Sequence, residues 1–487
     1  MLFNSYFYIF LFLPGTITVY FILNRHRLTI ASKTWLVIAS LVFYAWWNPI
    51  YTSLILGSIV FNYVMGRFIC RKWENRRHAR TRSILYAGIA GNLILLGYFK
   101  YTDFFIANMN SLAKLSIPLA QIVLPLGISF FTFTQIAYLV DASKGEVKEY
   151  SAMNYGLFVT FFPHLLAGPI IHHKEMMPQF DRRKNKVVDS GNLARGICLF
   201  FVGLFKKVVI ADTFAVWANA GFGSTGDLTM IEAWTASLSY TLELYYDFSG
   251  YTDMALGSSL MFNIILPVNF DSPYRSLNIQ EFWRRWHMTL GRFMRDYVYI
   301  PMGGNRVGEP QTLLNIMITF FIVGLWHGAG WTFVAWGLMH GAALVVHRLW
   351  GKLNISMPKW LAWLITFNFV NICWIFFRAP SFSDIVKVLK GMAGLSGAEI
   401  PESFAFRVAT LGGSWQTLDT LFERIGKGEI ILGMFAVFLP LSFLFRNSNK
   451  IIESLEPDVP QLIVFSLVAV ISILYLGSYS EFLYFRF

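Results

Sequence analysis

The sequence predicts an all-α integral membrane protein that crosses the bilayer many times, and three observations carry this prediction. Of its 487 residues 55% are hydrophobic and only 14% are charged, whereas soluble domains carry about a quarter charged residues. Apolar runs of about 17–25 residues, long enough to span a bilayer, recur along the chain. Lys and Arg gather in the short loops between them, as the positive-inside rule predicts. The net charge of +12 therefore does not indicate nucleic acid as a partner.

The apolar runs are continuous and lack the alternation of a membrane barrel, so each predicts a helix. The expected helices are 1–23, 34–48, 52–69, 83–99, 119–140, 195–217, 231–267, 312–327, 331–348, 359–377, 429–445 and 461–478. A further run, 152–171, has basic residues on both flanks and contains Pro163, Gly168 and Pro169, so a re-entrant element is expected there. We expect eleven to thirteen membrane segments in one membrane-embedded domain, 1–487, with a polar stretch at 379–428 that contains a short amphipathic segment, SDIVKVLKGMAGL.

The basic loops at 24–33 and 71–82 predict the orientation. Both should face the cytoplasm, which places the N-terminus outside. No Lys or Arg precedes Arg25, so the first run is interpreted as a retained helix and not as a cleaved signal peptide. The three cysteines are far apart and predict neither a disulfide framework nor a metal site. A formal G-x-G-x-x-G at 221–226 follows no strand and is dismissed as a dinucleotide site.

The stretch 278–300, NIQEFWRRWHMTLGRFMRDYVYI, predicts a charged amphipathic helix. At 100° per residue it has an apolar stripe, and most of its charges lie opposite. The stripe comprises Phe282, Trp286, Leu290, Phe293 and Tyr297, and the charged side comprises Glu281, Arg285, Arg292 and Arg295. His287 lies at the edge of the stripe beside Trp283, so it should point into the protein while the helix lies in the cytoplasmic interface. The alternative is an anchoring helix with an incidental histidine.

A second histidine, His327, follows the apolar run 312–326 directly. An ionisable residue inside a membrane segment is costly, so it is a functional-site hypothesis by default. Trp326 and Trp331 flank it together with three small residues, which suits a narrow tunnel. A neutral imidazole is a good general base near pH 7. The alternative is a histidine that bonds across helices as a packing device.

A third polar group combines acidic and basic residues within apolar sequence. Asp247 and Asp253 lie six residues apart, and Lys206 and Lys207 lie in GLFKKVVIAD. Ser249 or Asp247 is expected to cap a helix that begins near Gly250, and the other carboxylate can pair with a lysine. Buried lysines must pair, snorkel or face a polar interior. A role in polarising a histidine or gripping a substrate hydroxyl is the functional alternative.

Six motifs resemble the membrane-bound O-acyltransferase family over about residues 1–380. They are PLGISFFTFTQIAYLVD, HLLAGPI, GLFKKVVIAD, YYDFSGYTDMALG, FWRRWHMTLGRFMRDYVYIPMGGNR and GLWHGAGWTFVAWGLMHG. The resemblance is to the bacterial branch that contains the alginate O-acetylation membrane protein, and more distantly to the D-alanyl transfer protein of teichoic acid modification. It implies a ring of tilted helices around a thin centre, with funnels from both faces. It also implies that His327 is the essential histidine and that His287 is a second active-site histidine.

The resemblance further implies an acyl donor from the cytoplasmic side and an acceptor on the outer side of a bacterial inner membrane. We expect His327 to act as general base on an acceptor hydroxyl that attacks an acyl thioester, and His287 to orient the donor or stabilise the oxyanion. A histidine or a partner's serine that carries the acyl group transiently is an alternative. The acceptor would be a polysaccharide such as alginate, or a periplasmic acetyltransferase partner.

The expected donor is acetyl-coenzyme A, because guanidinium groups pair with phosphate. No bound cofactor and no metal are expected. The side chains considered for substrate or donor contacts are Trp283, Arg284, Arg285, Trp326, Asp247, Asp253 and Lys206. The alternatives are a D-alanyl or longer-acyl transferase, a transporter subunit of a polysaccharide secretion complex, and a structural membrane subunit. A transporter would more often show paired interrupted helices in corresponding halves, which the sequence lacks.

Overall fold

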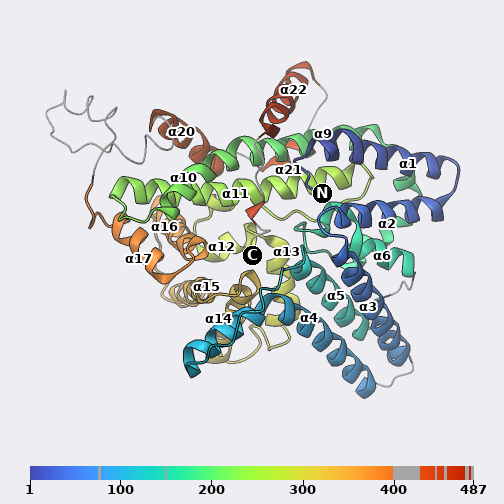
Figure 1. Ribbon diagram of the computed structural model, residues 1–487, viewed down its shortest axis with the longest axis horizontal. Coiled ribbons are helices and arrows are strands. Elements are labelled where there is room, and N and C mark those ends of the chain that lie inside the picture. Colours follow the sequence, from blue (N-terminus) through green and yellow to red (C-terminus); the bar gives the residue numbers. More distant parts are fainter. Residues whose placement is uncertain are drawn as a thin grey trace.

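The computed structural model describes seven segments of the chain: 1–74, 78–147, 151–398, 428–444, 447–454, 458–477 and 482–483. The regular secondary structure of these segments is helical, and they contain no β-strand. Helices α12 and α13 lie near the centre of the view in Figure 1, with the other helices around them. The predicted all-α membrane architecture is therefore confirmed.

The N-terminal part is a set of long helices. They are η1 (Tyr8–Phe12), α1 (Leu13–Arg25), α2 (Thr29–Ala45), α3 (Ile50–Glu74), α4 (His78–Ala113) and α5 (Ile128–Ser143). The expected helix at 119–140 begins only at Ile128, since Pro118 and Pro125 disfavour helix before it and Gly127 has a φ of +72°. Helix α4 is twice as long as expected, with 36 residues.

The middle of the chain holds the buried, broken element and the longest central helix. Its members are α6 (Ala152–Thr160), α7 (Phe162–Leu165), α8 (His173–Met176), η2 (Met177–Phe180), η3 (Arg183–Lys186), α9 (Ser190–Phe205), η4 (Lys206–Ala211), α10 (Asp212–Gly223) and α11 (Met230–Leu260). The run 152–171 is broken, as expected: the helix is interrupted at Phe161 and ends at Leu165. Residues 157–171 are all buried inside the protein.

The C-terminal half contains the central helices α12 and α13 and further helices around them (Figure 1). It comprises η5 (Pro273–Arg275), α12 (Ile279–Arg285), α13 (Met288–Met294), η6 (Arg295–Tyr299), α14 (Glu309–His327), α15 (Trp331–Trp350), α16 (Lys359–Arg378), α17 (Phe382–Met392), α20 (Gly428–Leu444), α21 (Ser448–Glu453), α22 (Val459–Leu474) and η7 (Tyr475–Gly477). The expected amphipathic segment of the stretch 379–428 is α17, and residues 399–427 lie outside the described part.

Five of the described helices are long and apolar enough to cross a membrane. They are Tyr8–Arg25, Ile50–Trp73, Thr81–Ala113, Glu309–His327 and Lys359–Arg378. Three shorter apolar helices, Thr29–Ala45, Ile431–Leu444 and Val459–Leu474, accompany them. Multiple crossing is thus evident, while the number of eleven to thirteen membrane segments stays a prediction.

Helix α11 corrects the expected cap near Gly250. It runs unbroken for 31 residues from Met230 to Leu260, so neither Asp247 nor Ser249 starts a helix. Gly250 serves another purpose, because a Cβ there would lie 2.7 Å from the carbonyl oxygen of Gly203. The glycine allows the backbones of α9 and α11 to touch, and this contact brings the lysines of η4 against α11.

Both acidic residues of the expected cluster form buried ion pairs across this contact. Lys207 Nζ lies 2.6 Å from Asp247 Oδ1 and 2.9 Å from Asp212 Oδ1. Lys206 Nζ lies 2.6 Å from Asp253 Oδ2. The expected pairing of a carboxylate with a lysine is confirmed, and it joins η4 to the central helix.

We predict that Asp247→Asn destabilises the protein by about 3 kcal/mol, because breaking a buried pair leaves an uncompensated charge. Asp212 still pairs with Lys207 in this variant, so the expected loss of stability is at the low end of the roughly 3–5 kcal/mol that breaking a buried ion pair costs. The measurement is thermal unfolding of the detergent-solubilised protein. Glu146→Gln is the control, since the side chains of Glu146 and its partner Lys174 are 37% and 51% exposed and exposed pairs contribute about 0–1 kcal/mol. Equal melting temperatures for the two variants would contradict the prediction.

Candidate active site

The two histidines singled out in the sequence lie side by side in the interior. The ring centroids of His287 and His327 are 6.3 Å apart. His287 is 0% exposed and His327 is 2% exposed. The chain folds back between them, because α14 follows the turn after η6 and brings its last residue, His327, to the start of α13. The two histidines that the family resemblance implies for one active site therefore lie close together.

His287 does not lie on a continuous helix, which corrects the expectation for 278–300. Helix α12 ends at Arg285, and His287 has a φ of +43° before α13 begins at Met288. The left-handed conformation turns the chain, so α12 and α13 are separate short helices with a π-helical turn, η6, after them. The apolar stripe still faces inward: Phe282, Trp286, Leu290 and Phe293 are each at most 3% exposed.

Asn269 holds the turn at His287. Its Oδ1 lies 3.1 Å from His287 Nδ1, 3.2 Å from the backbone nitrogen of Thr289 and 3.0 Å from Thr289 Oγ1. Its backbone oxygen accepts from the nitrogen of Met288 at 3.0 Å. Asn269 was not predicted from the sequence. The feature that could have indicated it is a polar amide side chain in the irregular stretch that follows α11.

These bonds define the tautomer of His287. The backbone N–H of Thr289 can only donate, so the amide atom that it faces is the oxygen of Asn269. A neutral imidazole has one N–H and one acceptor nitrogen, and Nδ1 must carry the hydrogen to donate to that oxygen. The Nε2 atom of neutral His287 is therefore the acceptor.

His327 is surrounded by aromatic rings. The ring centroids of Trp326, Trp336 and Phe377 lie 4.9, 5.0 and 5.1 Å from that of His327. Within the described part of the chain, the buried indole nitrogens of Trp326 and Trp336 have no hydrogen-bond acceptor. Two unused N–H donors thus lie on side chains that pack against His327.

An open cavity of about 950 Å³ approaches the pair. Its wall includes Met288 and Thr289, which follow His287 directly, and Val323, one helical turn before His327. The two histidines themselves do not line it. Its volume is in the usual range for small-molecule sites, so it can deliver a ligand to the edge of the histidine pair.

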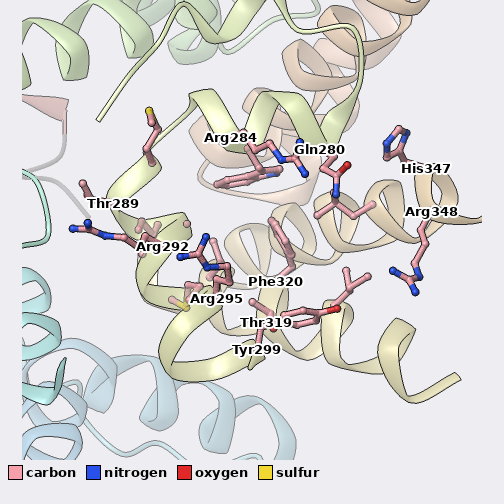
Figure 2. A pocket seen from close by; sticks show the side chains of 18 of the residues that line it. Gln280, Arg284, Thr289, Arg292, Arg295, Tyr299, Thr319, Phe320, His347 and Arg348 are labelled. Atoms are coloured by element: carbon pink, nitrogen blue, oxygen red, sulfur yellow. The ribbon is translucent and has the colours of Figure 1, made fainter. Parts of the chain in front are cut away.

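The wall of this cavity is basic. It includes four arginines and His347, and no Asp or Glu is among its described lining residues. Figure 2 shows Arg284, Arg292 and Arg295 on one side, with His347 and Arg348 across from them on another helix. Arg284 is exposed and makes no ion pair with any described residue, so it can bind an anion.

The other arginines of the wall are paired with carboxylates. Arg292 binds Glu175 through two bonds of 2.5 and 3.0 Å. Arg295 lies 2.7 Å from Asp296, and Arg348 lies 2.8 Å from Glu309. The charges of these three arginines are therefore partly neutralised by the carboxylates that they bind. Arg284 is the exception, because it has no carboxylate partner among the described residues.

The remaining predicted residues separate into two groups. Trp283 lines the cavity and donates from Nε1 to His340 Nδ1 at 3.2 Å, while Trp326 packs beside both histidines. Arg285 does not line the cavity and pairs with Glu281 and Asp271. Asp247, Asp253 and Lys206 lie in the ion pairs of α11 and η4 and do not line it either.

Two further histidines belong to a network at the end of α5. His173 Nδ1 lies 3.2 Å from Asp141 Oδ2, and His172 Nδ1 lies 3.0 Å from the hydroxyl of Tyr297. Burial lowers the pKa of His172, and the nearby charge of Arg292 lowers it further. Among the described residues no group of three or more His, Cys, Asp or Glu could hold a metal ion.

Comparison with known proteins identifies the family of this chain. The model of the membrane-bound O-acyltransferase family matches residues 105–382. The chain is 45% identical over 525 aligned residues to the peptidoglycan O-acetyltransferase of Helicobacter pylori, with 100% of this chain and 98% of the relative covered. It is 39% identical over 415 residues to the probable alginate O-acetylase AlgI of Pseudomonas aeruginosa, with 82% and 76% covered. A teichoic acid D-alanyltransferase of Streptococcus thermophilus is 29% identical over 280 residues, with 52% and 68% covered.

The chain belongs to the membrane-bound O-acyltransferase family. It is therefore a multi-pass membrane acyltransferase, and the family resemblance of its motifs is confirmed.

We predict that Asn269→Ala lowers kcat about 10- to 100-fold, because an ångström of misplacement of a reacting group can cost about 10²-fold. The measurement is acyl transfer per folded enzyme in membranes. Asn92→Ala is the matched control: Asn92 is also buried, at 2% exposed, and pairs with Asn62 away from the site. The prediction fails if both variants keep the wild-type kcat, or if both lose it equally.

Proposed function

We propose that this protein moves an acetyl group from a thioester donor on the cytoplasmic side to hydroxyl groups of an extracytoplasmic polysaccharide. The observation that carries the proposal is the pair His287 and His327, buried where the basic cavity ends. The two O-acetylating relatives compared above are named for a glycan, peptidoglycan in one case and alginate in the other. The full-length match to the peptidoglycan enzyme makes peptidoglycan the first acceptor to test.

In the proposed reaction His327 takes the proton of the acceptor hydroxyl as that oxygen attacks the thioester carbonyl. The tetrahedral intermediate carries a negative oxygen. Its collapse breaks the carbon–sulfur bond, and the departing thiolate takes the proton back from His327. Atoms and charges balance without a metal or a redox partner.

The tautomer of His287 favours one of its two expected roles. Its Nε2 accepts hydrogen bonds and does not donate them, so neutral His287 does not suit oxyanion stabilisation. It suits orienting the acyl donor, by accepting a hydrogen bond from an N–H group of that donor. We assign the oxyanion to N–H groups of the tryptophans beside His327. Trp326 and Trp336 have buried indole nitrogens without a described acceptor, and desolvated donors of this kind stabilise developing charge strongly.

The donor side of the proposal rests on charge. The cavity wall holds Arg284 without a described carboxylate partner, and guanidinium groups bind phosphate well. A phosphate-bearing thioester such as acetyl-coenzyme A fits this wall, which lies near the predicted cytoplasmic interface. The route to the glycan is direct in this proposal, and transfer through an extracytoplasmic partner acetyltransferase is the alternative that reconstitution with purified glycan distinguishes.

We predict that His327→Ala lowers glycan acetylation at least about 100-fold, because a general base contributes about 10²–10⁴-fold. The measurement is the ester-linked acetyl content of the cell-wall glycan in the native host, at matched membrane expression. His26→Ala, at an exposed loop position, is the control and should keep the wild-type content. Undiminished acetylation by a normally inserted His327→Ala protein would overturn the proposal.

We predict that Arg284→Gln raises the KM for acetyl-coenzyme A about 10-fold and changes kcat little, since a bond to a charged group contributes about 1.5–3 kcal/mol. The assay is transfer of radiolabelled acetyl groups in membrane vesicles with the cytoplasmic face outward. Arg182→Gln removes an exposed arginine that does not line the cavity. A KM that is unchanged, or one that rises equally in both variants, speaks against donor binding in this cavity.

A further inference from the structure

The end of α14 poses a problem that the proposed mechanism leaves open. The last four carbonyl oxygens of a helix have no partners within the helix, and hydrocarbon supplies no water to bind them. Helix α14 ends at His327, and Gly328 continues in an extended conformation with a φ of −158°. The backbone that carries His327 must therefore be bound from another element.

Helix α4 supplies the partners. Lys100 Nζ donates to the carbonyl oxygen of Trp326 at 2.5 Å and to that of His327 at 3.0 Å. The hydroxyl of the next residue, Tyr101, donates to the carbonyl oxygen of Leu325 at 2.6 Å. Two adjacent side chains of α4 thus bind three successive carbonyl groups at the end of α14.

The charge of Lys100 is unusual in its surroundings. The side chain lies within the apolar sequence LILLGYFKYTDFF of a candidate membrane span, where a charged side chain is costly. It makes no ion pair with a carboxylate of the described residues. Its ammonium lies instead at a helix C-terminus, where the helix dipole is negative, and 6.0 Å from the centre of the Trp326 ring.

A neutral donor would satisfy these carbonyl groups without the cost of a charge, as Tyr101 does one residue earlier. The two carbonyl groups that receive the charged donor belong to Trp326 and His327, the residues whose side chains meet His287. Charge-assisted bonds are shorter and about twice as strong as neutral ones. The cation therefore holds most firmly the part of α14 from which the proposed base projects.

We propose that Lys100 is a positioning residue of the acyl transfer, whose ammonium fixes the backbone of Trp326 and His327 and thereby the direction in which the His327 ring faces His287. The inference rests on the proposed function, in which His327 is the base. A helix cap with a structural role alone would change stability and expression but not the turnover of the folded enzyme.

The test compares Lys100→Met, Lys100→Arg and Tyr101→Phe in the full-length protein. Lys100→Met keeps the length of the side chain and removes the cation, whereas Tyr101→Phe removes one neutral bond to the adjacent carbonyl group and is the matched control. The assay measures kcat and KM with radiolabelled acetyl-coenzyme A and soluble peptidoglycan fragments in permeabilised membrane vesicles, so that each substrate reaches its own face of the membrane. Rates are expressed per inserted protein. His327→Ala is measured in parallel.

We expect Lys100→Met to lower kcat about 10- to 100-fold, the loss that misplacement of a catalytic group causes, with a KM for acetyl-coenzyme A within about twofold of wild type. Lys100→Arg should restore most of the turnover, and Tyr101→Phe should lose less than about fivefold. An unchanged kcat in Lys100→Met, a rise in KM alone, or an equal loss in Tyr101→Phe overturns the inference.

If Lys100→Met is not inserted, Lys100→Gln, which keeps a neutral donor, takes its place under the same criteria. Failure of both to insert also overturns the inference, because Lys100 would then serve folding alone. The His327→Ala variant distinguishes failure of the proposed function from failure of the proposed role of Lys100. An active His327→Ala refutes the proposed function, whereas an inactive His327→Ala with a fully active Lys100→Met refutes only the role of Lys100.

Discussion

The need to bind every polar backbone group away from water governs the architecture around the site. Both histidines lie where a helix begins or ends, so each sits beside backbone groups that the helix cannot satisfy. At His287 the partner is Asn269, and Thr289 extends the connection by accepting from the nitrogen of Ile170 at 3.0 Å. At His327 the partners are Lys100 and Tyr101. The broken element 152–171 and helix α4 are thus joined to the histidine pair through the same requirement.

Sequence reasoning predicted the fold class, most helix positions and the meeting of the two histidines. Composition and the length of the apolar runs predict membrane helices directly. The family motifs predicted that the two histidines belong to one site. The break at His287 could not be predicted, because an argument from 100° per residue assumes an unbroken helix. Asn269 and Lys100 act through contacts between segments far apart in the chain, as in the 3.1 Å approach of Asn269 to His287, and no local pattern reports such contacts.

The acidic cluster shows what a charge pattern alone leaves open. The expected pairing with lysine is confirmed, and it holds for both carboxylates, since Asp247 and Asp253 each lie 2.6 Å from a lysine of η4. The expected helix start near Gly250 is wrong, because the missing side chain of Gly250 allows α9 to approach α11. In both cases the role of the residue depends on where a second helix packs against α11. The sequence of α11 alone does not contain that information.

The two histidines do not line the cavity beside them, and this separation has an evolutionary consequence. Substitutions at wall positions away from Asn269, such as Ile316 or Leu344, can change the shape of the cavity while the imidazoles and their supports stay as they are. The compared relatives carry different acyl groups in their names, acetyl and D-alanyl. A scaffold built in two such parts can diversify its substrates without redesigning its chemistry.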